Sequence, residues 1–184
     1  MEFRAVRGEL TRKNVERMTG KKMDIPMADA GILASELLKE RPEVCYDVGV
    51  VPHLCDLKDP AVKKLLASYD NAKFINVKDD PLQVVKEIAE CRYIISSSLH
   101  GLIVADSMGI PNMYLVFGDR LLGDGYKFED YYSAYGVEAQ PRDLRTEKAP
   151  ELTEIEEQYQ ILPEMVEEKK HQMKAAFPYP VKNR

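Results

Sequence analysis

The feature that most constrains the fold is the stretch Cys91–Asn112, CRYIISSSLHGLIVADSMGIPN. The apolar run Tyr93–Ile95 has the length and composition of a strand. Three serines, Ser96–Ser98, follow it, and serine is a preferred helix N-cap. Apolar residues then recur at helical spacing until Gly109, which together with Pro111 marks a helix C-terminus. This order predicts a strand, a polar turn and a helix.

Three further strand-like runs lie on either side, at Tyr46–Val51, Phe74–Val77 and Asn112–Val116. The helices predicted between them begin at Asp59–Pro60 and Asp79–Pro81, where proline suits the first helical position. The alternation β-α-β-α-β with short connections implies right-handed crossovers and a parallel sheet. We therefore predict an α/β fold, a Rossmann-like parallel sheet with flanking helices. Neither a GxGxxG dinucleotide fingerprint nor a Walker A motif is present.

The chain is expected to form one main domain with a C-terminal extension. Residues 1–140 form the α/β domain, residues 141–150 a polar, proline-bounded linker, and residues 151–184 a helical segment and a poorly ordered tail. Pro163 is expected to kink or split that segment. The remaining predicted elements are a short edge strand and two helices, at Phe3–Val6, Gly8–Met18 and Lys127–Tyr135.

Length, charge and cysteine content exclude several classes of protein. A chain of 184 residues, 45% hydrophobic and 31% charged, fits one soluble globular domain. The net charge of −5 argues against a nucleic-acid partner. No apolar run approaches the ~20 residues of a membrane span, and no apolar signal region follows Met1. The odd number of cysteines predicts reduced thiols in a cytoplasmic protein, at Cys45, Cys55 and Cys91.

Several side chains are candidates for an anion site at the carboxyl edge of the sheet. His100 falls in the first helical turn after the central strand, at the edge where open α/β sheets bind ligands and helix N–H groups favour anions. Arg7 and Arg4 carry the planar fork that suits carboxylate and phosphate, and Lys127 is a candidate phosphate contact. Each has an ordinary alternative, a local hydrogen bond for His100 and simple solvation for the cationic side chains.

Two other groups of side chains are open to more than one interpretation. Tyr131 and Tyr135 share a helix face, and tyrosines both stack on sugars and pack in cores. His53 and Cys55 follow the strand Tyr46–Val51 with metal-ligand chemistry, but no convincing third ligand lies nearby. The alternatives to metal binding are that His53 lines a cleft or that it is a hydrogen-bonded histidine of a loop.

The pattern SSSLHG…DSMGIPN within Ser96–Asn112 resembles the C-terminal core motif of the polysaccharide pyruvyl transferase family. The opening VRGELTRK, Val6–Lys13, is similar to the family's VRGxLT segment. The segment GDGYKFEDYYSAYG, Gly123–Gly136, resembles a segment of family members from exopolysaccharide clusters. The resemblance implies the C-terminal lobe of a two-lobed, GT-B-like architecture, in which a further N-terminal lobe precedes the VRG segment.

The resemblance also implies a reaction and a set of site residues. The family moves a pyruvyl group from phosphoenolpyruvate to two hydroxyls of a sugar, with no cofactor and no metal. His100 matches the LHG histidine and takes the acid–base role, and Arg7 matches the VRG arginine that holds the donor. Many members carry arginine where this chain has Ser98, and ADAG stands here in place of a GDPA-like turn. Taken together with the residue chemistry above, the predicted substrate-binding residues are Arg7, Arg4, Ser97, Ser98, Gly101, Lys127 and Tyr131.

Two alternatives stand beside a transferase of cell-surface polysaccharide precursors. The first is a GT-B-like glycosyltransferase that uses a nucleotide-sugar, since one fold serves both chemistries. The second is a non-catalytic lobe that acts as a binding or assembly module. The expected partners are phosphoenolpyruvate and a sugar or lipid-linked oligosaccharide acceptor, with a homodimer or a separate N-terminal lobe completing the cleft. The expected location is the cytoplasm or the inner face of the membrane.

Overall fold

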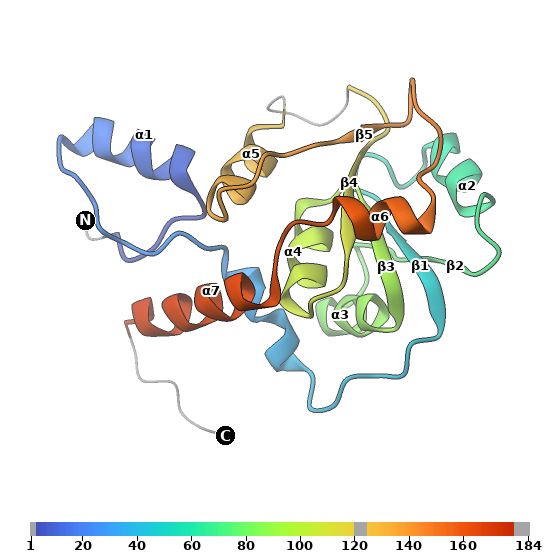
Figure 1. The fold of residues 1–184 in the computed structure, drawn as a ribbon, viewed down its shortest axis with the longest axis horizontal. Coiled ribbons are helices and arrows are strands. Elements are labelled where there is room, and N and C mark those ends of the chain that lie inside the picture. Colours follow the sequence, from blue (N-terminus) through green and yellow to red (C-terminus); the bar gives the residue numbers. More distant parts are fainter. Residues whose placement is uncertain (1–2, 120–124, 179–184) are drawn as a thin grey trace.

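The fold is organised on a single parallel sheet (Figure 1). The structure, a computed structural model, describes residues 3–119 and 125–178. Its strands pair in the order β2-β1-β3-β4-β5 and every pair is parallel, which confirms the α/β prediction. The strands are β1 Tyr46–Val51, β2 Ala72–Phe74, β3 Cys91–Ser96, β4 Asn112–Val116 and β5 Arg142–Asp143.

Helices connect and flank these strands. They are α1 Glu9–Thr19, α2 Pro60–Leu66, α3 Pro81–Ala89, α4 Leu99–Ser107, α5 Tyr126–Ser133, α6 Leu152–Gln158, α7 Pro163–Ala176 and a 3-10 helix, η1 Ala30–Leu37. Asp59 and Asp80 cap α2 and α3 by accepting backbone N–H groups, and a proline follows each cap, as predicted. Gly109, at φ 64°, lies just beyond α4 as a helix-ending glycine should.

The core lies on both faces of the sheet because successive strand side chains point in opposite directions. Val48 and Val50 of β1 face the cluster closed by α2 and α6, in which Ile155 is fully buried. Val51 and Ile94 face the other side, where α3 and α4 cover them. Helices on both faces are the arrangement expected of a doubly wound parallel sheet.

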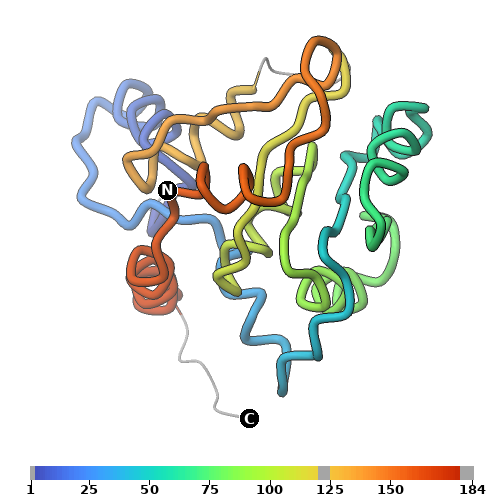
Figure 2. The backbone as a smooth tube through the Cα atoms, turned by 45° about the vertical axis from the view of Figure 1, so that its right-hand side comes forward, coloured from blue at the N-terminus to red at the C-terminus, as the bar shows by residue number. Residues whose placement is uncertain are grey.

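The C-terminal segment departs from the predicted linker. Residues 141–150 contain β5, which pairs with Leu115 and Val116 of β4 and extends the sheet by one strand. Figure 2 shows the orange-to-red segment then turning back, so that α7 lies beside the chain that leads into η1. The segment splits into α6 and α7 at Pro163, as predicted. Of the predicted tail, residues 179–184 lie outside the described residues.

Two short strands were predicted wrongly, one at Phe3–Val6 and one at Phe74–Val77. Phe3–Val6 forms no edge strand, because Val6 makes a single isolated bridge, to Met27. β2 spans Ala72–Phe74, two residues before the apolar run 74–77 that predicted it. Ile75 still donates its N–H to Val50 at 2.9 Å, so pairing with β1 continues just past the strand.

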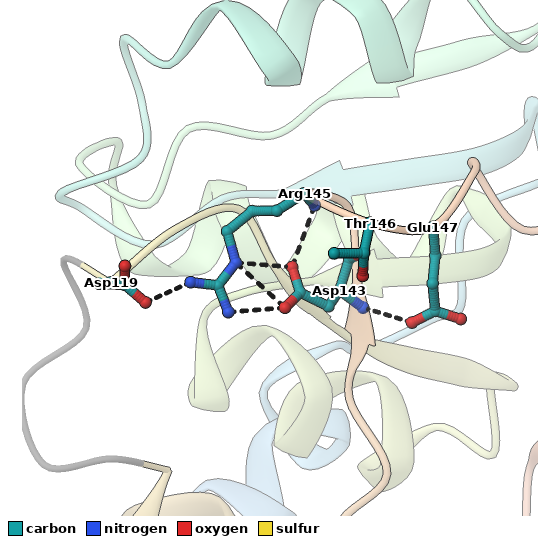
Figure 3. Close-up of polar contacts among 5 residues, drawn as sticks. All are labelled: Asp119, Asp143, Arg145, Thr146 and Glu147. Carbon is teal, nitrogen blue, oxygen red and sulfur yellow. Dashed lines mark hydrogen bonds and ion pairs between the residues drawn. The ribbon is translucent and has the colours of Figure 1, made fainter.

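A network of charged side chains orders the turn after β5 (Figure 3). Arg145 donates to both carboxylate oxygens of Asp143, from Nε at 2.8 and 3.0 Å and from Nη2 at 2.6 Å, and its Nη1 reaches Asp119. The backbone N–H of Asp143 donates to Glu147 at 2.9 Å. Arg145 and Asp119 are exposed, so this network arranges the surface and adds little stability.

Asp106 of α4 is the centre of a buried polar hub. Its carboxylate accepts hydrogen bonds from Asn112 at 2.6 Å, from the Tyr131 hydroxyl at 2.6 Å and from the Tyr159 hydroxyl at 3.0 Å. Burial raises the pKa of Asp106 to about 6, although the three hydrogen bonds act in the opposite direction. The hub joins α4 to β4, to α5 and to the segment after α6. Within the described part of the chain, no helix is both long and apolar enough to cross a membrane.

Candidate functional site

The site lies where the strand order reverses, at the carboxyl ends of β1 and β3. The chain after β1 crosses to β2 on one side, and the chain after β3 continues to β4 on the other. Ligands bind at such a switch point in open α/β sheets. The backbone N–H of His53 donates to Ser97 Oγ at 2.8 Å, and Ser96 Oγ donates to the Val51 carbonyl at 2.7 Å. These bonds hold the two strand ends together.

A hollow of about 270 Å³ opens at this point. Its polar lining comes from four distant parts of the chain: the segment before α1, the end of β1, the start of α4 and the start of α5. The polar side chains that line it are Arg7, His53, Ser98, His100 and Lys127. The guanidinium and the imidazole that the sequence placed at one anion site therefore share one hollow.

Arg7 is held in place by a buried carboxylate on α5. Asp130 is fully buried, and its Oδ2 accepts from Arg7 Nε at 3.1 Å. The same carboxylate accepts from the backbone N–H and the hydroxyl of Thr11, at 2.8 and 2.7 Å, which fixes α1 beside α5. A Cβ on Gly8 would lie 1.6 Å from the Asp130 carbonyl oxygen, so only glycine permits this approach. The contacts with Asp130 thus fix the VRG turn, Val6–Gly8, and with it the position of the Arg7 side chain at the hollow.

The start of α4 forms the opposite side of the hollow. Ser98 occupies the N-cap position, as predicted, but no side chain caps the helix. Ser98, Leu99 and His100 line the hollow, so the first N–H groups of α4 lie beside it with their partial positive charge. His100 is exposed, and its ring also borders a second hollow of about 280 Å³, lined mainly by apolar side chains of α3 and α4.

The electrostatics of the hollow favour an anion. Burial lowers the pKa of Lys127; the neighbouring Cys55 opposes this shift, and Arg7 reinforces it. Burial and then Lys127 also lower the pKa of His53, and Asp56 opposes this shift, so the surroundings favour the neutral ring. The charges of Arg7 and Lys127 therefore repel one another across the hollow. An anion bound between them would relieve that repulsion.

Four of the predicted substrate-binding residues lie elsewhere. Tyr131 is fully buried and donates to Asp106, so it packs the core instead of touching a sugar. Ser97 is fully buried and its hydroxyl is committed to the loop after β1. A Cβ on Gly101 would lie 2.5 Å from the hydroxyl of Ser96, which makes Gly101 a packing residue. Arg4 is exposed and does not line the hollow.

The sequence interpretation missed two buried carboxylates that organise the site. Asp130 orients Arg7, and Asp56 accepts from Ser97 Oγ at 2.7 Å behind the loop of His53. Both side chains are at most 2% exposed. An aspartate in a helix or a loop carries no sequence signal of burial, so neither residue could be found without the fold.

Comparison with known proteins gives the family. The family model described as polysaccharide pyruvyl transferase matches residues 3–117. An uncharacterized protein of Acanthamoeba polyphaga mimivirus is 35% identical over 143 residues, which cover 74% of this chain and 49% of that protein. The chain thus spans about half the length of this curated relative. No solved structure matches. From the VRG turn through β4, this chain belongs to the polysaccharide pyruvyl transferase family.

Proposed function

We propose that the hollow binds phosphoenolpyruvate and supplies the donor-binding and acid–base groups of a pyruvyl transferase acting on a polysaccharide precursor. The observation that carries the proposal is the convergence of Arg7, Lys127, the start of α4 and His100 on one hollow. A donor that bears both a carboxylate and a phosphate needs two cationic contacts, and Arg7 and Lys127 provide them. Ser98 then adds a hydroxyl where many relatives have arginine.

The chemistry of ketal formation assigns a role to His100. Its imidazolium form protonates the methylene carbon of phosphoenolpyruvate as one sugar hydroxyl attacks the adjacent carbon and gives up its proton to a base. The second hydroxyl then attacks the same carbon, the C–O bond to phosphate breaks, and phosphate leaves with that electron pair and takes the proton of the second hydroxyl. His100 is exposed on one side, so solvent can restore its proton between turnovers.

The acceptor and the cover of the site belong to the same proposal. Water must be excluded so that the donor is not hydrolysed, whereas the hollow described here is open to solvent. We propose that a further lobe or a second copy of the chain covers it and carries the sugar or lipid-linked acceptor. A cytoplasmic protein, working in solution or at the inner face of the membrane, would meet both substrates there.

A thermal-shift titration tests the donor site. At a concentration about 100 times Kd, a ligand stabilises the folded state by about 2.7 kcal/mol, which for a domain of this size raises Tm by roughly 5–10 °C. We expect phosphoenolpyruvate to produce this shift in the wild type, and Arg7→Ala to abolish it. Arg4→Ala is the matched control, because Arg4 lies outside the hollow, and it should keep the shift.

Three ligands separate this function from its competitors. Inorganic phosphate and pyruvate, each carrying one of the two anionic groups, should give smaller shifts than phosphoenolpyruvate at equal ionic strength. The absence of a shift with phosphoenolpyruvate, or an equal shift in Arg7→Ala, would contradict the donor site. A shift with a nucleoside diphosphate but none with phosphoenolpyruvate would favour the glycosyltransferase alternative.

A further inference from the structure

The loop after β1 brings a thiol and an imidazole into contact. Cys55 Sγ lies 3.0 Å from His53 Nδ1. The backbone N–H of Cys55 also donates to Nδ1, at 3.4 Å, so Nδ1 is the acceptor and the ring hydrogen of the neutral imidazole lies on Nε2. The thiol thus lies within hydrogen-bond distance of an imidazole nitrogen that can take its proton. Asp56 Oδ1 also accepts a hydrogen bond from Sγ, at 3.5 Å, so the carboxylate competes with Nδ1 for the thiol proton and opposes formation of a thiolate.

The surroundings of this pair differ from those of the other two cysteines. The His53 ring lines the cationic hollow, Cys55 is half-buried beside it, and Lys127 interacts with Cys55 electrostatically. Cys45 is exposed, and its thiol meets the backbone carbonyl of Glu43 at 3.4 Å. Cys91 is buried, and burial raises the pKa of its thiol to about 12. Cys91 also has a cation nearby, Lys73, but of the three cysteines Cys55 alone has an imidazole in contact as well as a nearby cation in the described structure.

We propose that His53 and Cys55 form a nucleophilic pair, and that Cys55 is a covalent modification site for small carbon electrophiles that carry an anionic group. The pair supplies the nucleophile and its base, and the cations of the hollow select the anionic group. This inference depends on the geometry of the hollow and not on pyruvyl transfer. It assigns the loop after β1 a reactivity beyond the proposed function.

The covalent step is a simple displacement. Nδ1 of His53 removes the thiol proton as sulfur attacks the electrophilic carbon, a C–S bond forms, and the leaving group departs with the electron pair of the bond that breaks. With iodoacetate, iodide leaves and the product is S-carboxymethyl cysteine. The carboxylate of iodoacetate would lie against Arg7 or Lys127, where the neutral amide of iodoacetamide gains no such attraction.

Competitive alkylation of the intact chain tests this inference, with the modified peptides quantified by mass spectrometry. At pH 7 we expect iodoacetate to label Cys55 at least about tenfold faster than Cys45, although Cys45 is the more exposed thiol. The ratio of iodoacetate to iodoacetamide rates should be several times higher at Cys55 than at Cys45. Cys91 should stay unlabelled in the folded chain. Equal rates at Cys55 and Cys45, or equal reagent ratios at both, would overturn the inference.

Two variants separate the contributions of the base and of the cation to the labelling rate of Cys55. His53→Asn should slow labelling of Cys55 by both reagents, because the base is lost. Lys127→Ala should slow iodoacetate much more than iodoacetamide, because only the charge contact is lost. Rates at the exposed Cys45 report equal access of the reagent in each sample, and an unlabelled Cys91, which is buried, reports that each variant is folded. Unchanged labelling of Cys55 in His53→Asn would refute the pair.

Protection by phosphoenolpyruvate keeps this inference separate from the donor proposal. If both hold, saturating phosphoenolpyruvate slows labelling of Cys55 and leaves Cys45 unaffected. Fast, anion-selective labelling of Cys55 without protection would support the nucleophilic pair and count against the donor site. An inert Cys55 in a chain that binds phosphoenolpyruvate would refute the pair and leave the donor site standing.

Discussion

Replacement of Asp130 by asparagine tests how Arg7 is positioned. The variant keeps the shape of the side chain and removes its charge. The native carboxylate is fully buried and accepts three hydrogen bonds, one from Arg7 and two from Thr11. An asparagine has only one acceptor oxygen, and its NH2 group faces the N–H and O–H donors of Arg7 and Thr11, from which it cannot accept hydrogen bonds. The guanidinium of Arg7 also loses its ion-pair partner.

The expected loss of stability follows from these contacts. A hydrogen bond to a charged group contributes about 1.5–3 kcal/mol when buried, but the Arg7 side chain is 28% exposed, so solvent reduces its share to about 1 kcal/mol. Weakening of the two Thr11 bonds adds about 1–2 kcal/mol. We expect Asp130→Asn to lower the free energy of unfolding by about 2–3 kcal/mol, and phosphoenolpyruvate to bind the folded variant about tenfold more weakly.

Urea unfolding with a matched control measures the stability loss. Glu129→Gln removes one negative charge from the neighbouring position on α5, where the side chain is exposed, and should change stability by less than about 0.5 kcal/mol. A double-mutant cycle with Arg7→Met should give a coupling energy of about 1 kcal/mol between Arg7 and Asp130. Equal stability of Asp130→Asn and Glu129→Gln, or no coupling in the cycle, would refute the positioning of Arg7 by Asp130.

Three further predictions address other elements. Burial raises the pKa of Asp106 from its ordinary value of 3.8 to about 6, so the protonated side chain stabilises the fold. This stabilisation is complete below pH 3.8 and is lost as the pH rises through about 6, and the free energy of unfolding falls by about 3 kcal/mol. Urea unfolding across this pH range should show the fall in the wild type and not in Asp106→Asn. Gly8→Ala should cost more than about 3 kcal/mol by clashing with Asp130, whereas Gly118→Ala, with open space at its Cβ, should be nearly neutral. His100→Gln should leave urea stability within about 0.5 kcal/mol, because the ring is exposed. In the protein completed by the lobe or second copy that covers the site, it should abolish pyruvyl transfer from labelled phosphoenolpyruvate, and transfer at the wild-type rate would exclude His100 from the reaction.

Most of the sheet could be predicted because its strands carry their own signal. β1 and β4 have the predicted bounds, since both are short apolar runs bounded by proline or polar residues. β5 could not be predicted, because Arg142 and Asp143 are polar and pair with β4 only once the chain has folded back. The position of β2 was predicted wrongly for a related reason: Ile75, which gave the predicted run its apolar character, is fully buried although it follows the end of the strand.

The candidate site was predictable only where a motif carried it. The VRG and LHG segments indicated Arg7 and His100, and both line one hollow because α4 follows β3 and Asp130 of α5 holds Arg7. Tyr131 was misjudged because helical spacing places a tyrosine on a face without saying whether that face meets solvent or the core. Asp130 belongs to neither motif, and it orients Arg7 although the two residues are 123 positions apart in the sequence.

A crystal structure of this chain with phosphoenolpyruvate tests the donor site most directly. We expect the donor in the hollow at the ends of β1 and β3, with an anionic group within hydrogen-bond distance of Arg7 and its methylene carbon facing the His100 ring. A donor bound elsewhere on the chain, or a hollow left empty at saturating phosphoenolpyruvate, would contradict it.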